Sequence, residues 1–147
     1  MSRNYFLKMV GAADWPLDDH WIASRPELLR EVGTTKRPVG IGRDDYLVYY
    51  SAVSQKLFAV VRAKGAGSEA PIGGGPGEGR WPYRLQVQAL LVIPQLALAP
   101  SWTVLDLPKS KVQQKSYVSI SATEYATARE AMIERTSLSP PGSEGKG

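Results

Sequence analysis

Short runs of apolar and aromatic residues recur along the chain at a length typical of β-strands. Five runs are expected to be strands: residues 5–10, 45–51, 57–63, 85–93 and 117–120. The second and third runs are separated by a short break at residues 53–55, and this arrangement predicts an antiparallel hairpin. In the fourth run, Leu85, Val87 and Ala89 alternate with two glutamines, which is the pattern of a half-buried strand.

Two further segments carry the signals of a helix N-terminus. Ser24 is followed three residues later by Glu27, which is the spacing of a capping box, and Gly33 is placed to end that helix. Ser121 and Glu124 repeat the same spacing ahead of a second helix. We expect the second helix to end at about residue 135.

Glycine and proline mark the segments that we expect to lie outside these elements. Residues 64–79 hold seven glycines, but Pro76 interrupts them and no Gly-Lys-Ser/Thr sequence ends the run. This composition predicts a flexible loop rather than a phosphate-binding loop. Residues 137–147 are rich in proline and glycine and predict a disordered tail. The remaining residues 1–136 predict one domain.

The order of the elements indicates the fold class. Strands do not alternate regularly with helices, so a doubly wound parallel sheet is not expected. We predict an α+β fold in which helices flank a curved or closed sheet.

Composition narrows the range of proteins to which the chain could belong. The chain has 147 residues, of which 43% are apolar and 22% are charged, as in ordinary globular proteins. No apolar run approaches the ~20 residues of a membrane helix, and residues 1–15 lack the pattern of a signal peptide. Cysteine is absent, which excludes disulfides and thiolate chemistry. These features predict a cytoplasmic protein.

The net charge of +4 is concentrated in two regions of the chain. Residues 34–64 carry six basic side chains against two acidic ones, and residues 80–120 carry five against one. Such segregation suits a basic face that binds phosphates. An ordinary solvated surface with a slight excess of lysine is the alternative.

No constellation of residues in the chain predicts catalysis or metal binding. His20 is the only histidine, and Asp18, Asp19 and His20 are consecutive, so they cannot all point at one ion without a special turn. Ser24 or Ser51 as a nucleophile would need His20 as its base. We therefore expect no metal, no cofactor and no catalytic residue.

Four segments carry a resemblance to a known family: Tyr5–Lys8, Asp45–Ser51, Leu57–Arg62 and Trp81–Arg84. Their aromatic first strand, Tyr-Tyr-Ser strand end and Pro-aromatic-Arg unit resemble the EVE domain. That family belongs to the PUA-like group, and YTH and ASCH domains are its relatives. The resemblance implies a PUA-like, mostly antiparallel β-barrel of about five strands flanked by helices. It also implies a pocket between barrel and helices that accepts a modified base of DNA or RNA.

This hypothesis assigns residues to the pocket and to the nucleic-acid backbone. A base that leaves a duplex needs flat partners on its faces, which aromatic side chains supply. The expected base-binding residues are Trp21, Tyr50, Ser51, Trp81, Tyr83 and Arg84. The expected backbone contacts are Lys36, Arg37 and Arg43. Tyr49 and Tyr50 point to opposite faces of their strand, and the family pattern favours Tyr50 for the pocket.

Two other functions remain open at this level. Some ASCH relatives hydrolyse amides on nucleoside-like compounds with a lysine and a glutamate, and Lys8 with Glu27 is the corresponding candidate pair. The second alternative is a protein-interaction module. The expected partner is DNA or RNA with a modified base, and no membrane is expected. The sequence leaves the oligomeric state open, with a monomer as the default.

Overall fold

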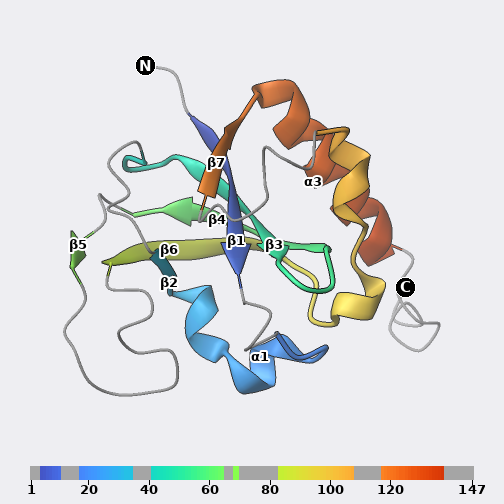
Figure 1. Ribbon diagram of the computed structural model, residues 1–147, viewed down its shortest axis with the longest axis horizontal. Coiled ribbons are helices and arrows are strands. Elements are labelled where there is room, and N and C mark those ends of the chain that lie inside the picture. Colours follow the sequence, from blue (N-terminus) through green and yellow to red (C-terminus); the bar gives the residue numbers. More distant parts are fainter. Residues whose placement is uncertain are drawn as a thin grey trace.

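A curled mixed sheet with helices on two sides forms the described part of the protein (Figure 1). The computed structural model describes residues 4–10, 17–34, 41–64, 68–69, 83–107 and 117–137. The strands are β1 (Tyr5–Val10), β2 (Glu31–Thr34), β3 (Tyr46–Ser51), β4 (Leu57–Ala63), β5 (Ser68–Glu69), β6 (Tyr83–Val92) and β7 (Tyr117–Ile120). The helices are α1 (Trp21–Ser24), α3 (Ala122–Ser137) and the 3₁₀ turns η1 (Pro26–Leu29), η2 (Leu96–Leu98) and η3 (Trp102–Leu105).

The strands follow the order β2-β6-β4-β3-β1-β7, and β5 adds to β6. Every described strand pair is antiparallel except β1 with β3, which is parallel. The sheet is a half-barrel, and the predicted α+β, PUA-like fold class is confirmed. The estimate of five strands is low, because β2 and β5 are short and carry little apolar pattern of their own.

The predicted hairpin is confirmed as β3 and β4. Its register shifts between Tyr49, which faces Ala59, and Tyr50, which faces Leu57, so Phe58 is an extra residue on β4. A bulge of this kind bends its strand and increases the local twist. The hairpin therefore contributes to the curl of the sheet.

The two faces of the sheet are covered by different parts of the chain. On the inner face, Trp21 of α1 packs against Phe58, and the Tyr49 hydroxyl donates a hydrogen bond to the Leu28 carbonyl of η1. On the outer face, Tyr125 of α3 packs against Tyr5 and Tyr46. Both faces are apolar beneath their cover, so β1, β3 and β4 carry almost continuous runs of buried residues.

The helix predicted from Ser24 to Gly33 forms only as the 3₁₀ turn η1, and its predicted cap and end are wrong. Ser24 ends α1, and its hydroxyl lies 3.4 Å from the Trp21 carbonyl instead of capping a helix. Arg25 is not helical (φ −136°, ψ 57°), because the proline ring of Pro26 disfavours helical backbone in the preceding residue. Gly33 does not end a helix and lies in β2.

The second helix is confirmed as α3, and its capping box is formed. The Ser121 amide donates to Glu124 Oε1 at 2.9 Å, and the Glu124 amide donates to Ser121 Oγ at 3.0 Å. Tyr125, Ala128 and Met132 supply its buried face. The helix lies across the outer face of β1 and β4 (Figure 1).

Some sequence predictions fall on parts of the chain that are not described. Most of the glycine-rich segment 64–79 and nearly all of the tail 137–147 lie outside the described residues. Within the described residues, no helix is long and apolar enough to cross a membrane.

Candidate functional site

The predicted base pocket does not assemble as expected, and Trp21 shows why. Its side chain is fully buried, its Nε1–H donates to the Ile93 carbonyl at 2.8 Å, and its ring meets Phe58 edge-on at 4.8 Å. The expected rim position is therefore wrong, because all of the surface of Trp21 is used by the core.

Tyr49 and Tyr50 lie on opposite faces of β3, as the strand geometry predicts. Tyr49 is on the inner face, where its hydroxyl donates to the Leu28 carbonyl at 2.7 Å and its ring contacts Phe58. Tyr50 is on the outer face, with its ring 6.1 Å from Trp102, and burial raises its pKa. The tyrosine that shares a core with Trp21 is therefore Tyr49 and not Tyr50.

Ser51 is the last residue of β3 and braces the hairpin turn that follows it. Its side chain is buried, its hydroxyl is hydrogen-bonded to that of Ser54, and it accepts the Lys56 amide at 3.1 Å. These bonds occupy the polar atoms that were expected to read a base edge.

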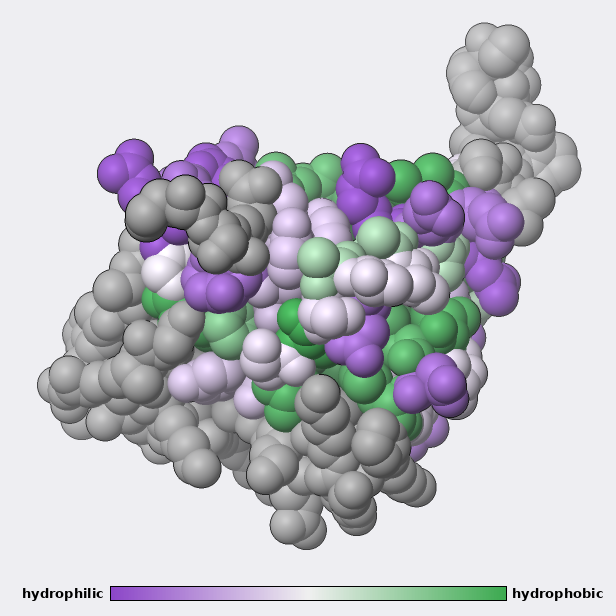
Figure 2. All heavy atoms as spheres, turned by 90° about the horizontal axis from the view of Figure 1, so that it is seen from above, coloured by the Kyte–Doolittle hydropathy of each residue, from purple (hydrophilic) through white to green (hydrophobic). Residues whose placement is uncertain are grey.

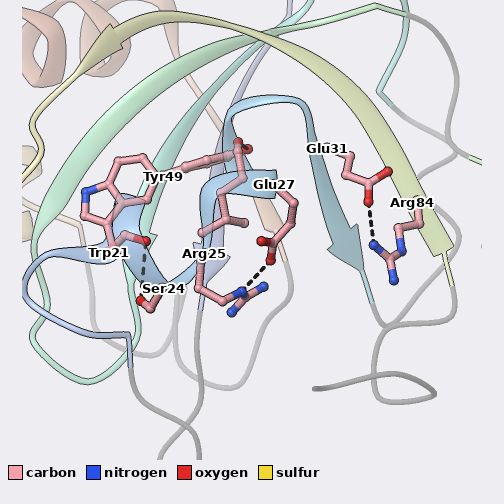
Figure 3. A network of polar contacts seen from close by, with 8 residues as sticks. Trp21, Ser24, Arg25, Glu27, Glu31, Tyr49 and Arg84 are labelled. Atoms are coloured by element: carbon pink, nitrogen blue, oxygen red, sulfur yellow. Dashed lines mark hydrogen bonds and ion pairs between the residues drawn. The ribbon is translucent and has the colours of Figure 1, made fainter. Parts of the chain in front are cut away.

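Arg84 forms an ion pair across the strand pair β2–β6. Its Nη1 lies 2.6 Å from Glu31 Oε2 (Figure 3). Gln86 Nε2 donates to the other carboxylate oxygen at 3.2 Å. The side chain of Arg84 is 34% exposed, so it is accessible but already paired. Its role in binding stays a prediction.

Several predicted site residues are not placed by the structure. Trp81, Lys36 and Arg37 lie outside the described residues, and of Tyr83 only the backbone is described. Arg43 is described and exposed.

Lys8 is buried in the inner core, although lysine is seldom found there. Its Nζ donates to the Met9 carbonyl at 2.6 Å. Burial lowers the pKa of Lys8 to about 7, and the Arg25 guanidinium contributes to the decrease. The carboxylate of Glu27, its suggested catalytic partner, is held by Arg25 at 2.5 Å (Figure 3).

Beyond α3, the outer face of β4 and β6 is polar. We define this polar face as Arg62 on β4 and Arg84, Gln86 and Gln88 on β6. The last three alternate along β6 with the buried Leu85 and Val87. Arg62 Nη2 donates to Gln88 Oε1 at 2.5 Å, and Arg62 also forms an ion pair with Asp44. The polar face is thus rich in donors, and its two arginines are neutralised by carboxylates.

Three further cations lie just outside neighbouring strands, and we call them the basic edge: Arg30 precedes β2, Arg43 precedes β3 and Lys64 follows β4. The Val87 amide on β6 donates to the Arg30 carbonyl at 2.7 Å, and the Lys64 amide donates to the Gln86 carbonyl at 2.8 Å. The turn that holds Arg43 is tied to the same place, because the Asp44 amide donates to the Ala63 carbonyl at 2.7 Å. These hydrogen bonds bring the backbones of the three basic residues to one region of the sheet.

The charges of the basic edge are available to a ligand. All three side chains are exposed, and none forms an ion pair with another described residue. The nearby Asp45 is buried, and its carboxylate accepts the amides of Asn4 and Gly42 at 3.0 and 2.8 Å. The two partly exposed carboxylates next to this edge, Glu31 and Asp44, are each paired with an arginine of the polar face.

The described residues offer little for a metal ion. No group of three or more possible ligands gathers in this part of the chain. His20 is exposed and lies 3.7 Å from Asp19. Asp19 accepts hydrogen bonds from Gln95 and from the Ala97 amide, which lower its pKa and join the start of α1 to η2.

Comparison with known proteins identifies the fold. No family model matches the chain, and no curated protein matches its sequence. The Mmi1 YTH domain, solved in complex with RNA, is 5% identical with a TM-score of 0.59, covering 90% of this chain and 82% of that one. The YTH domain of Zygosaccharomyces rouxii MRB1, in complex with N6-methyladenosine RNA, is 11% identical with a TM-score of 0.57, covering 87% and 85%. The chain shares the fold of YTH domains.

The same fold occurs in proteins of other names. Protein Atu2648 from Agrobacterium tumefaciens is 14% identical with a TM-score of 0.55, covering 87% of this chain and 92% of that one. Identities this low show the YTH-like, PUA-like fold alone. The narrower assignment to EVE domains stays a prediction.

Sequence reasoning did not name Arg30 or Lys64 as site residues, although Lys64 was counted in the basic region. Both stand at the end of a structural element, beside an apolar strand. The sequence signal that could have identified them is a basic residue directly before or after an apolar run. Strand pairing then brings such positions to one region of the sheet.

Proposed function

We propose that the protein binds single-stranded nucleic acid, with backbone phosphates along the basic edge. The observation that carries this proposal is that backbone hydrogen bonds bring Arg30, Arg43 and Lys64 to one region of the sheet, where all three side chains are exposed and none forms an ion pair with a described residue. Phosphate contacts by arginine and lysine supply most non-specific affinity for nucleic acid. The shared fold with two YTH domains that were solved with RNA supports the same function.

The dimensions of the basic edge suit a short stretch of backbone. It crosses four neighbouring segments, β2, β6, β4 and the start of β3. Adjacent strands lie about 4.8 Å apart, so the edge spans about 14 Å. The donors of the polar face lie beside it and can contact sugar or phosphate oxygens.

Salt dependence tests this proposal directly. For a single strand, each phosphate contact contributes about 0.7 to the slope of log affinity against log salt concentration. We expect Arg43→Ala and Lys64→Ala each to reduce the slope by about 0.7 in titrations with an RNA or DNA oligomer. Arg135→Ala, an exposed arginine near the end of α3, is the matched control and should leave the slope unchanged.

Two results would contradict the proposal. One is the absence of binding to any oligomer at low salt. The other is an equal loss of affinity in the control and in the two edge variants.

We propose further that the bound strand carries a modified base. The resemblance to EVE domains supports this, as does the presence of N6-methyladenosine RNA in the MRB1 structure. Affinity should then differ between otherwise identical oligomers with and without the modification. Equal affinity across a panel of base modifications, in both RNA and DNA, would contradict modified-base recognition. The protein would then be a general nucleic-acid-binding module.

Amide hydrolysis is the second candidate function, and the state of Lys8 is what favours it. A lysine whose pKa is near 7 can act as a base or nucleophile at neutral pH. The side chain is 1% exposed, however, so a substrate would require the inner face to open. The test is to measure turnover of a panel of modified nucleosides. Turnover by the unchanged protein that is lost in Lys8→Met would show hydrolysis rather than binding alone.

A further inference from the structure

A hollow of about 280 Å³ opens on the outer face, between β6 and α3. It is lined by Tyr46, Val60, Leu90, Leu91, Tyr125 and Arg129. Leu90 is 45% exposed, which is unusual for a leucine in the middle of a ten-residue strand. Hydrophobic surface lies among polar residues in the space-filling view (Figure 2).

A second bulge creates the apolar wall of this hollow. Val61 faces Ala89 and Val60 faces Leu91, so Leu90 is an extra residue on β6. Bulges re-aim side chains, and here two consecutive leucines line the same hollow. In a regular strand, Leu90 and Leu91 would point to opposite faces.

The hollow begins where the polar face ends. Leu90 comes two residues after Gln88 on β6, and Val60 comes two residues before Arg62 on β4. Tyr46 is the direct cross-strand partner of Arg62. The donors of the polar face and the apolar hollow therefore form one continuous surface.

We propose that this hollow holds one unstacked base of a single strand whose backbone lies on the polar face and the basic edge. The inference rests on the proposed function and names a base subsite for it. It places that subsite beneath α3, on the side of the sheet opposite Trp21.

The chemistry of the lining fits a nucleobase. Leu90 and Leu91 offer apolar surface to a base plane, with the buried Val60 beneath them, and the rings of Tyr46 and Tyr125, which pack on each other, border the hollow. Arg129 is exposed, forms no ion pair with a described residue, and can reach a base edge or the adjoining phosphate.

The size of the hollow and the charges around it favour a base over other occupants. About 280 Å³ is slightly less than the smallest pockets of drug-sized ligands, which begin at about 300 Å³. A protein partner would need a contact of roughly 800 Å² on each side. Arg129 in the lining and the basic edge beyond the polar face are complementary to a phosphodiester, so we commit to a nucleic acid.

The first test uses matched pairs of exposed residues. We expect Leu90→Asn and Arg129→Gln each to weaken binding of a single-stranded oligomer about fivefold or more, the low end of what one stacked base contributes. Val53→Asn, at an equally exposed apolar position in the β3–β4 turn, and Arg135→Gln are the controls and should bind normally. Leu90→Met should keep the affinity, and urea melts confirm that all variants fold.

The second test locates the base. An oligomer that contains 5-iodouridine should form photocrosslinks to Tyr46, Tyr125 or the neighbouring part of β6. These crosslinks should disappear in Leu90→Asn. Crosslinks confined to other surfaces, or a folded Leu90→Asn variant with normal affinity, would overturn the inference.

The two proposals fail in different ways. Absence of binding to any oligomer at low salt removes both. Binding that depends on Arg43 and Lys64 but not on Leu90 or Arg129 keeps the proposed function and removes the base subsite. Saturable binding of a peptide in the hollow, without competition by oligomers, would assign this surface to a protein partner instead.

Discussion

At the scale of single residues, Lys8 shows how strongly the surrounding fold changes a side chain. It lies in β1 between β3 and β7, opposite Tyr49 on one side and Tyr117 on the other. An ammonium group buried in apolar surroundings loses its hydration, so the neutral amine is favoured. This burial, with the charge of Arg25, lowers the pKa of Lys8 to about 7.

The stability of the protein should therefore rise with pH above neutrality. The folded-state pKa of Lys8 is about 7 and the ordinary value is 10.5, so between these pH values the unfolded chain holds more protons. The free energy of unfolding then increases with pH, by about 1.4 kcal/mol per unit in the middle of the window. Urea melts at several pH values within the window measure the slope.

Lys8→Met is the matched variant, because methionine fills a similar space without a charge. Its free energy of unfolding should be nearly independent of pH in the same range, and below neutral pH it should exceed that of the unchanged protein. Parallel pH profiles for the two proteins would show that Lys8 is not the group responsible.

At the scale of elements, one sequence pattern leads to two different structures. Ser24 and Glu27 have the same spacing as Ser121 and Glu124, but only the second pair forms a capping box. Pro26 prevents Arg25 from adopting helical backbone, and Glu27 pairs with Arg25 instead. Residues 122–137 contain no proline, so the cap there is followed by a regular helix.

Replacing Ser121 and Ser24 with alanine should therefore lower the free energy of unfolding by different amounts. Ser121→Ala removes an acceptor for the Glu124 amide and should lower the free energy of unfolding by about 1 kcal/mol. Ser24→Ala removes only a long contact to the Trp21 carbonyl and should change stability by less than about 0.5 kcal/mol. Urea melts of both variants measure the difference, and equal losses would contradict the assignment of the caps.

At the scale of the whole molecule, β1 connects the two parts of the sheet. It pairs with β3 in parallel and with β7 in antiparallel register, so it joins the β3–β4 hairpin to the C-terminal strand and helix. Four of its apolar side chains, Phe6, Leu7, Met9 and Val10, are buried. The N-terminal segment is therefore part of the core.

Removing residues 1–10 should abolish cooperative folding. Four buried apolar side chains at about 1.5–3 kcal/mol each amount to most of the roughly 5–15 kcal/mol that stabilises a domain. A chain that ends at Ser137 is the control, and we expect it to unfold like the full chain. Circular dichroism and urea melts compare the two truncations, and a cooperative transition in the chain that lacks β1 would contradict this role.

Elements with a strong local pattern could be predicted from the sequence alone. The β3–β4 hairpin, the alternating strand β6 and the capped helix α3 were each predicted with nearly correct bounds. The short strand β2 could not be, because its four residues include Gly33 and become a strand only by pairing with β6. The parallel pairing of β1 with β3 joins distant segments, and no local signal encodes it.

The sequence by itself determined the residue types of the site: aromatic strand ends, basic residues outside apolar runs and an excess of positive charge. Tertiary structure alone decided which of them face solvent. Trp21 has the composition of a stacking residue but is buried, because α1 folds over the inner face. Arg30, Arg43 and Lys64 come from separate segments, and only backbone hydrogen bonds between neighbouring segments bring them to one region of the sheet. Periodicity is a local property that a sequence displays, whereas exposure and proximity depend on which segments pair.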